Sequence, residues 1–100
     1  HEENMIAKFL RFYSKTNKNS LEPSGLAIQP FTRDIYIIST VGKLLVVVDS
    51  DGKLKNVIKL SPAVFKQPEG IAFDSAGNLF ISNEGRKGKG NILKFAYSQN

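Results

Sequence analysis

An internal repeat constrains the fold of this chain more than any other feature of its sequence. Pro23 and Pro68 open two similar copies that are offset by 45 residues. Three pairs of segments match: 23–28 with 68–73, 34–39 with 78–83, and 42–47 with 90–95. A third, weaker match pairs residues 6–9 with residues 92–95. Repeats of this length are typical of propellers and solenoids, in which each copy is one supersecondary unit.

The matched segments have the composition of short β-strands. They are rich in Ile, Val and Tyr and are bounded by Gly, Asp and Ser. Asp51-Gly52 and Gly77-Asn78 are hairpin turn signals, because glycine adopts positive φ without steric cost. The first copy therefore predicts four strands, at residues 24–29, 34–40, 43–49 and 54–61.

The predicted third strand indicates how the sheets are packed. Residues 44–48 (LLVVV) are apolar on both faces of a strand, whereas a sheet with one wet face would alternate apolar and polar residues. Four short antiparallel strands per copy, covered on both faces, predict an all-β fold of β-propeller blades.

The repeat also predicts the domain organisation. Residues 21–65 and 66–100 each form a blade, and residues 1–20 form an N-terminal strand or partial blade. A helical stripe of apolar residues at positions 6, 9, 10 and 13 leaves a helix open for residues 4–15, although the repeat match favours a strand. Propellers close with about four to eight blades, so we expect these two to belong to a larger propeller, or to a homo-oligomer that completes the ring.

The composition limits the function classes open to these residues. Hydrophobic residues make up 41% and charged residues 23%, as in a globular domain. The chain has no cysteine and its one histidine is His1, so an internal Ser-His or Cys-His pair and a thiolate metal site are excluded. No apolar run approaches the ~20 residues that span a membrane. Glu2 and Glu3 stand where a signal peptide would have basic residues, so we expect no signal in this chain.

One stretch of the second copy carries a family resemblance. Residues 66–74 (KQPEGIAFD), followed by residues 77–85 (GNLFISNEG), resemble the SdiA-regulated protein family, and residues 23–28 and 41–47 are also similar to it. The resemblance covers roughly residues 21–97. It implies the C-terminal portion of a bacterial β-propeller that is periplasmic, secreted or associated with the outer envelope. The same pattern is similar to NHL-repeat propellers and to calcium-dependent lactonase and gluconolactonase propellers.

Glu69 is the first candidate for a binding residue. It lies between Pro68 and Gly70, at the start of the predicted innermost strand. In the lactonase propellers that this motif resembles, the equivalent position often holds a metal-binding Asn, and a carboxylate is a hard oxygen ligand suited to Ca²⁺. The structural alternative is that Glu69 accepts a hydrogen bond from the backbone of the neighbouring blade. Ser24 occupies the same place in the first copy and could contribute a hydroxyl to a ligand.

Two further groups complete the candidate set. Asn83 and Glu84 follow the predicted second strand, and they could bind a polar ligand or make ordinary turn contacts. Arg86, Lys87 and Lys89 lie in a glycine-rich loop that could touch an anionic surface but is first of all a solvated hairpin. The loop lacks the Gly-Lys-Ser/Thr of a phosphate loop and the aromatic residues that stack on bases, so we expect no nucleic-acid partner.

Other carboxylates are better explained by turns. Asp74 predicts an Asx-type turn after the first strand of the second copy, and residues 49–52 predict a hairpin turn rather than a calcium loop. The scattered lysines fit the edges of sheets, where they block unwanted strand pairing. The net charge of +5 favours acidic partners.

These observations predict a non-catalytic, ligand- or protein-binding propeller of the bacterial cell envelope, with Ca²⁺ as a candidate cofactor. The alternative is a metal-dependent hydrolase resembling the lactonase propellers, which would rely on metal-activated water and carboxylates. We expect a largely buried core from the two copies. Its predicted members are Leu26, Ile28, Ile35, Ile37, Leu44, Val46, Ile71, Phe73, Leu79, Ile81, Ile92 and Phe95.

Overall fold

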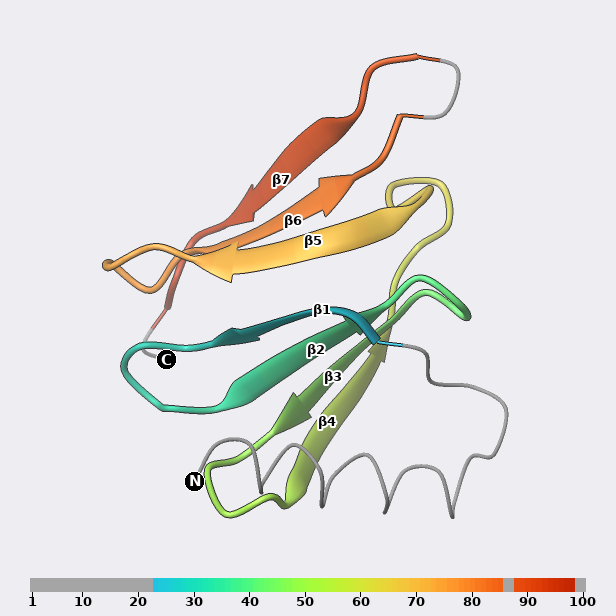
Figure 1. Ribbon diagram of the computed structural model, residues 1–100. Coiled ribbons are helices and arrows are strands. Elements are labelled where there is room, and N and C mark those ends of the chain that lie inside the picture. The colour runs from blue at the N-terminus through green and yellow to red at the C-terminus, as the bar shows by residue number, and fades with distance from the viewer. Residues whose placement is uncertain (1–22, 86–87, 99–100) are drawn as a thin grey trace.

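The computed structural model describes residues 23–85 and 88–98, and these form two antiparallel β-sheets without a helix (Figure 1). The first sheet contains four strands in chain order: β1 (Pro23–Ile28), β2 (Ile35–Ser39), β3 (Leu44–Val48) and β4 (Leu54–Lys59). The second contains three: β5 (Pro68–Phe73), β6 (Leu79–Asn83) and β7 (Asn91–Phe95). The predicted all-β class is confirmed, and the sheets have the order and length of propeller blades.

The predicted strand or partial blade of residues 1–20, with its helical alternative for residues 4–15, lies outside the described residues. β1 to β4 all fall within residues 21–65, and β5 to β7 fall within residues 66–100. Each sheet is therefore built from one copy of the repeat.

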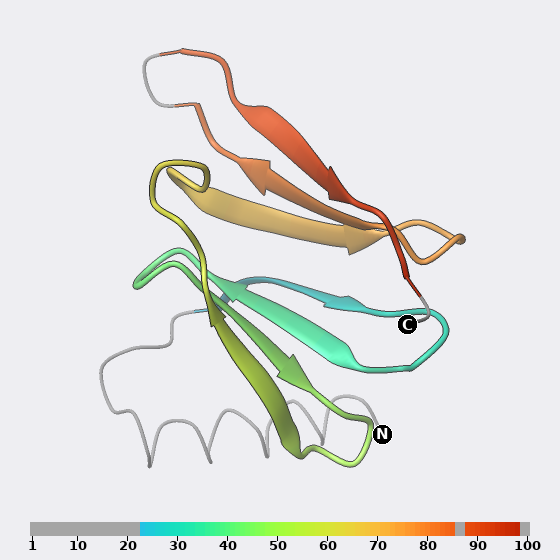
Figure 2. The same cartoon turned by 180° about the vertical axis from the view of Figure 1, so that it is seen from behind.

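The two sheets pack against each other through their faces, and β1 lies next to β5, as both views show (Figures 1 and 2). A buried apolar cluster fills the space between them. Its buried members are Ile38, Leu45, Leu60, Phe65 and Ile81, and its partly buried members are Tyr36, Ile71, Leu79 and Leu93. Residues from both sheets contribute, so each sheet buries one of its faces against the other.

The first sheet also buries its opposite face. Ile35, Ile37, Val46 and Val48 form a second cluster in which each side chain is at most 1% exposed. Successive side chains of a strand point to opposite faces, so Ile37 and Ile38 enter different clusters. The apolar character of β3 on both faces is thereby explained, as the sequence predicted.

The third strands of the two copies align differently from the sequence match. Ser39 pairs with Leu44 in the first sheet, and Asn83 pairs with Asn91 in the second. Leu44 is therefore equivalent to Asn91 in the structure. The sequence match of residues 42–47 with residues 90–95 aligns Leu44 with Ile92, one residue later. A slip of one residue moves every side chain of a strand to the other face.

This slip explains part of the error in the predicted core. Ile92 lies on the face of the second sheet that points away from the first, and it is 69% exposed. Phe95 and Leu26 are also exposed, at 43% and 38%, so these three predictions were wrong. The other predicted residues are buried or half-buried.

Gly25 permits the close approach of β1 to β5. An added Cβ at Gly25 would lie 3.0 Å from the carbonyl oxygen of Glu69 and 3.2 Å from a methyl carbon of Ile71. The same Cβ would lie 3.2 Å from a methyl carbon of Ile38. Because the first of these atoms belongs to the backbone, a larger residue could be accommodated only by moving the strands apart.

Truncation of a side chain in the second cluster should lower the stability of the fold. We expect Ile37→Ala to lower the free energy of unfolding by about 2–5 kcal/mol, because it removes buried methyl groups and leaves a cavity. Urea denaturation followed by circular dichroism measures the loss, with Val57→Ala at an exposed position of β4 as the control. A loss below about 1 kcal/mol for Ile37→Ala would show that this face is not packed as described.

Gly25→Ala tests the approach of the two sheets. We expect it to lower the free energy of unfolding by about 1–3 kcal/mol through overpacking against β5. Gly88→Ala is the matched control, since an added Cβ there meets nothing within 4 Å. Equal effects of the two substitutions on the urea midpoint would contradict close contact at Gly25.

Candidate functional site

Four of the predicted site residues lie at one end of the two sheets. β1 and β5 begin at this end, and the pairings of Pro23 with Ser39 and of Pro68 with Asn83 bring the ends of β2 and β6 beside them. Ser24, Glu69, Asn83 and Glu84 therefore share one end, as antiparallel pairing requires. We call this the polar end.

Ser24 connects the two sheets at the polar end. Its Oγ lies 3.3 Å from the carbonyl oxygen of Ile38 and 3.5 Å from that of Pro68. The hydroxyl of Thr40 donates a hydrogen bond of 2.6 Å to the same oxygen of Pro68. Pro68 is buried, and its carbonyl oxygen receives its hydrogen bonds from the first sheet. Ser24 has a structural role here, and Thr40 shares it.

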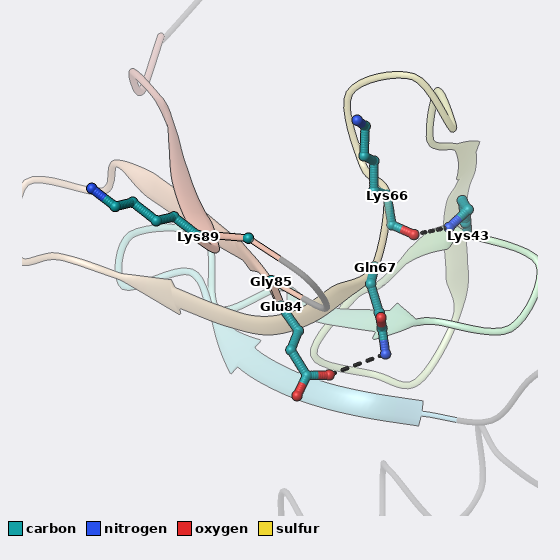
Figure 3. Close-up of a pocket in the computed structure, with 7 residues that line it drawn as sticks. Lys43, Lys66, Gln67, Glu84, Gly85 and Lys89 are labelled. Carbon is teal, nitrogen blue, oxygen red and sulfur yellow. Dashed lines mark hydrogen bonds between the residues drawn. The ribbon is translucent and has the colours of Figure 1, made fainter.

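Gln67 joins the two predicted glutamates. Its Nε2 donates to Oε1 of Glu69 at 3.2 Å and to Oε2 of Glu84 at 3.1 Å, and Figure 3 shows the second of these bonds. The backbone N–H of Glu84 donates to the carbonyl oxygen of Gln67 at 2.9 Å, which fixes the two segments to each other. Both carboxylates are exposed, and neither has an ion-pair partner within residues 23–85 and 88–98.

Asn83 is buried and holds the end of β6 in place. Its Nδ2 donates to the carbonyl oxygen of Val64 at 3.3 Å and to Oδ1 of Asn91 at 2.8 Å. Its Oδ1 is buried without a hydrogen-bond partner in the described part of the chain. The amide group is thus directed at the loop before β5 and at β7, and the glutamates lie outside that network.

A pocket of about 550 Å³ adjoins Gln67 and Glu84, and lysines line much of it (Figure 3). The ammonium group of Lys43 donates to the carbonyl oxygen of Lys66. Lys89 extends away from both of these lysines in Figure 3. Their charges therefore do not converge on one point. Arg86 and Lys87, the other predicted members of an anionic-surface loop, lie outside the described residues.

The remaining buried or turn-forming carboxylates are already engaged. Asp34 forms an ion pair with Lys55, in which Nζ of Lys55 lies 2.8 Å from Oδ2 of Asp34. Oδ1 of Asp49 accepts the backbone N–H groups of Asp51 and Lys53, each at 2.9 Å, which confirms the predicted hairpin turn. In the described ranges, no group of three or more His, Cys, Asp or Glu residues is placed to hold a metal ion. Glu69 and Glu84 are the carboxylates best placed for an external ligand.

The predicted Asx-type turn at Asp74 is also confirmed. Oδ1 of Asp74 accepts the N–H groups of Ala76 at 3.1 Å and Asn78 at 2.9 Å, and Oδ2 accepts the side-chain amide of Asn78 at 2.9 Å. The hydrogen bonds from Asn78 lower the pKa of the Asp74 carboxyl below its ordinary value of 3.8.

Two glutamines were missed by the sequence reasoning. Gln29, which is 2% exposed, accepts the N–H groups of Phe31 and Thr32 on Oε1 and donates to the carbonyl oxygen of Gly77 at 3.4 Å. It occupies the repeat position of Asp74, so the repeat carried a signal for its turn-forming role. Gln67 lies within the motif of residues 66–74, but nothing in its own identity indicated that it would connect two carboxylates.

Two antiparallel sheets that are built from successive repeats and packed face to face define a protein of the β-propeller class. The chain matches the SdiA-regulated family over residues 10–86, and it belongs to that family. No curated protein matches it significantly. Among the described residues there is no helix of the length and apolarity required to cross a membrane.

The lowered pKa of Asp74 predicts an acid dependence of stability. A carboxyl whose pKa is lower in the folded state stabilises the fold above its unfolded pKa, and this contribution disappears as the pH falls through the folded pKa. We therefore expect Asp74→Ala to be less stable than the wild type at pH 7, and the difference to shrink below pH 3.8. Urea midpoints measured across this range test it, with Asp51→Ala as the control. A difference that is independent of pH would contradict it.

Proposed function

We propose that this chain forms part of a non-catalytic binding propeller of the bacterial cell envelope, and that its polar end binds a cation, with Ca²⁺ as the ion. The observation that carries the proposal is the bridge from Gln67 to Glu69 and Glu84. Two exposed carboxylates share one neutral amide group there, and neither forms an ion pair with a described residue, although lysines line the adjoining pocket. Like charges held close together favour a positively charged ligand.

The donor set suits Ca²⁺ in part. Ca²⁺ takes six to eight oxygen ligands and accepts carboxylates, amide carbonyls and water. Glu69 and Glu84 supply carboxylate oxygens, and rotation of the Gln67 amide by half a turn would present Oε1 in place of Nε2. The remaining ligands would be water or groups outside the described residues. A site with two carboxylates and an exposed position corresponds to weak affinity, in the range of about 10⁻⁴–10⁻³ M.

The non-catalytic assignment rests on how the polar side chains at this end are used. The Ser24 hydroxyl is hydrogen-bonded to backbone carbonyl groups, and none of its partners in the described part of the chain is a base that could activate it as a nucleophile. The Asn83 amide is used in hydrogen bonds that hold the fold together. The hydrolase alternative would use the same two glutamates around a metal-activated water. It therefore shares the cation site and differs in having turnover.

We infer the envelope location from the family, and the acidic nature of the partner from the net charge. Membership of the SdiA-regulated family supports an exported propeller, and the net charge of +5 fits an acidic ligand or an envelope protein with an acidic surface. Fractionation of cells that express the natural full-length protein tests this part. Recovery in the cytoplasmic fraction alone would contradict it.

A calcium titration tests the cation site. We expect 10 mM Ca²⁺ to stabilise the chain by about 1.4 kcal/mol if the dissociation constant is about 1 mM, since a ligand of the folded state stabilises by mass action. Thermal melting should then shift upward by several degrees. Glu69→Gln and Glu84→Gln should each abolish the shift and leave the melting point without calcium nearly unchanged. Asp51→Asn, which removes a charge from an exposed turn at the other end of the sheet, should retain the shift.

Three results would change the conclusion. Absence of a calcium shift in the wild type would reject the cation site. A large loss of stability in Glu69→Gln without calcium would show that Glu69 acts as a structural hydrogen-bond acceptor, at a cost of about 1–3 kcal/mol. Calcium-dependent hydrolysis of glucono-1,5-lactone that is lost in Glu84→Gln would favour the hydrolase alternative.

A further inference from the structure

Glu69 is the extra residue of a β-bulge at the start of β5. In the pairing of β5 with β6, Pro68 lies opposite Asn83. Gly70 lies opposite Ser82, the residue directly before Asn83, so three residues of β5 face two residues of β6. A bulge interrupts the ladder and redirects a side chain, and bulges are common next to functional sites. The direction of the Glu69 carboxylate therefore depends on what holds the backbone before the bulge.

Two side chains of the β2–β3 turn (residues 40–43) hold this backbone. The ammonium group of Lys43 donates to the carbonyl oxygen of Lys66, as Figure 3 shows. The hydroxyl of Thr40 donates to the carbonyl oxygen of Pro68 at 2.6 Å. Both donors belong to the first repeat and both acceptors to the second, so the turn joins the two repeats directly beside the polar end.

These bonds orient the residues of the candidate cation site. A peptide group is planar, so a bond to its carbonyl oxygen also fixes the direction in which the next residue begins. The Lys66 carbonyl precedes Gln67, and the Pro68 carbonyl precedes Glu69. The carbonyl oxygen between them, that of Gln67, accepts the N–H of Glu84 at 2.9 Å. The amide and the carboxylates of the site are therefore positioned in part by a turn of the other sheet.

The backbone of the β2–β3 turn is itself held firmly. Gly42 and Lys43 have positive φ, at 77° and 51°. This conformation is uncommon for a residue with a side chain, and it persists where the surrounding structure holds it. The N–H of Lys43 donates to the carbonyl oxygen of Thr40 at 3.2 Å, and the carbonyl oxygen of Lys43 accepts the N–H of Leu60 at 2.8 Å. The turn is thus fixed within the first sheet, while its two side chains reach the segment that begins the second.

Thr40 makes the closer of two hydroxyl contacts with Pro68. Its Oγ1 lies 2.6 Å from the carbonyl oxygen, whereas Oγ of Ser24 lies 3.5 Å from it. The Ser24 hydroxyl is also nearer to the carbonyl oxygen of Ile38, at 3.3 Å. Pro68 is less than 2% exposed, so water cannot readily replace the Thr40 hydroxyl.

We propose that the β2–β3 turn positions the cation site of the polar end, with Thr40 as the main positioning residue. The inference rests on the proposed cation site, to which Gln67, Glu69 and Glu84 would supply the ligands. The turn belongs to the first repeat and these ligands to the second. Cation binding and the contact between the repeats should therefore strengthen each other, since coupling between two events is reciprocal. The cation would thus regulate how firmly two successive repeats are held together.

Thr40→Val tests the proposal on the complete 100-residue chain. Valine has nearly the shape of threonine, so this substitution removes the hydroxyl without a change of charge. We expect Thr40→Val to raise the dissociation constant for Ca²⁺ at least about tenfold, because loss of a group that orients metal ligands typically weakens metal binding by about 10–100-fold. Thr40→Ser, which keeps the hydroxyl, should restore the binding. Calcium titrations followed by nuclear magnetic resonance at the backbone amides of Glu69 and Glu84 give the constants.

Thr32→Val is the matched control. Oγ1 of Thr32 accepts the backbone N–H of Asp34 at 3.2 Å in the β1–β2 turn, at the opposite end of the sheets. This variant also loses one hydrogen bond of a threonine hydroxyl, and it should keep the calcium affinity of the wild type. The difference between the two variants separates positioning of the site from a general loss of stability. Circular dichroism spectra that match the wild type establish that the variants are folded.

Hydrogen exchange tests the coupling in the other direction and needs no variant. Excess Ca²⁺ should slow exchange of the Lys43 N–H in the wild type, although the β2–β3 turn holds none of the proposed ligands. The N–H of Gly52, which donates to the carbonyl oxygen of Asp49 at 3.0 Å in the β3–β4 turn, is the control. It lies at the other end of the same sheet and should exchange at an unchanged rate.

The possible failures are distinguishable. Absence of calcium binding by the wild type would reject the cation site and this inference with it. Equal binding by the wild type and Thr40→Val would overturn the inference alone and leave the cation site standing. An equal loss of binding in Thr32→Val would do the same, because it would show a general effect of stability. Unchanged exchange at Lys43 in the calcium-bound wild type would also overturn it.

Discussion

The contact between β1 and β5 is the constraint on which the rest of this structure depends. A three- or four-stranded antiparallel sheet of this size must cover its apolar faces, and the cluster between the two sheets does so with residues from both. Gly25 allows that approach, because its missing side chain leaves room for the backbone at Glu69. Gln29 and Gly77 provide a second connection at the opposite end of the same strands, through a hydrogen bond of 3.4 Å.

The same contact also creates the polar end. The carbonyl oxygen of Pro68 receives hydroxyl groups from the first sheet, and this fixes the point from which β5 begins. The next side chain along β5, that of Glu69, is left exposed beside Gln67 and Glu84. A structural serine in the first copy and a candidate ligand in the second therefore occupy one repeat position, because Ser24 has a following sheet to bind and Glu69 has none among the described residues.

Much of the fold could be predicted from the sequence, since it depends on local pattern. The β-branched runs, the turn glycines and the repeat are sufficient to place the strands of both copies within one or two residues. The alignment of β3 with β7 could not be obtained in this way, because the connection before β7 is longer than that before β3, and the sequence match does not show where the additional residues lie. Pairing of Asn83 with Asn91 decides it, and the buried side-chain amide of Asn83 donates a hydrogen bond to the Asn91 side chain in this pair.

The candidate site was predictable to a similar degree. Antiparallel pairing alone brings the start of β5 and the end of β6 together, so the proximity of Glu69 and Glu84 follows from strand order. Their connection through Gln67 depends on the path of the loop before β5, which the sequence pattern does not specify. Asn83 shows the reverse case: its position at the strand end was foreseen, whereas its burial against Val64 required the folded loop.

The polar end carries charges of both signs. Glu69 and Glu84 share the amide of Gln67 without an ion-pair partner in the described part of the chain, and Lys43, Lys66 and Lys89 line the adjoining pocket. Lys43 donates to the carbonyl oxygen of Lys66, and Lys89 extends away from both of these lysines (Figure 3). The positive charges of the pocket oppose the binding of a cation nearby, which fits the weak affinity that two exposed carboxylates predict.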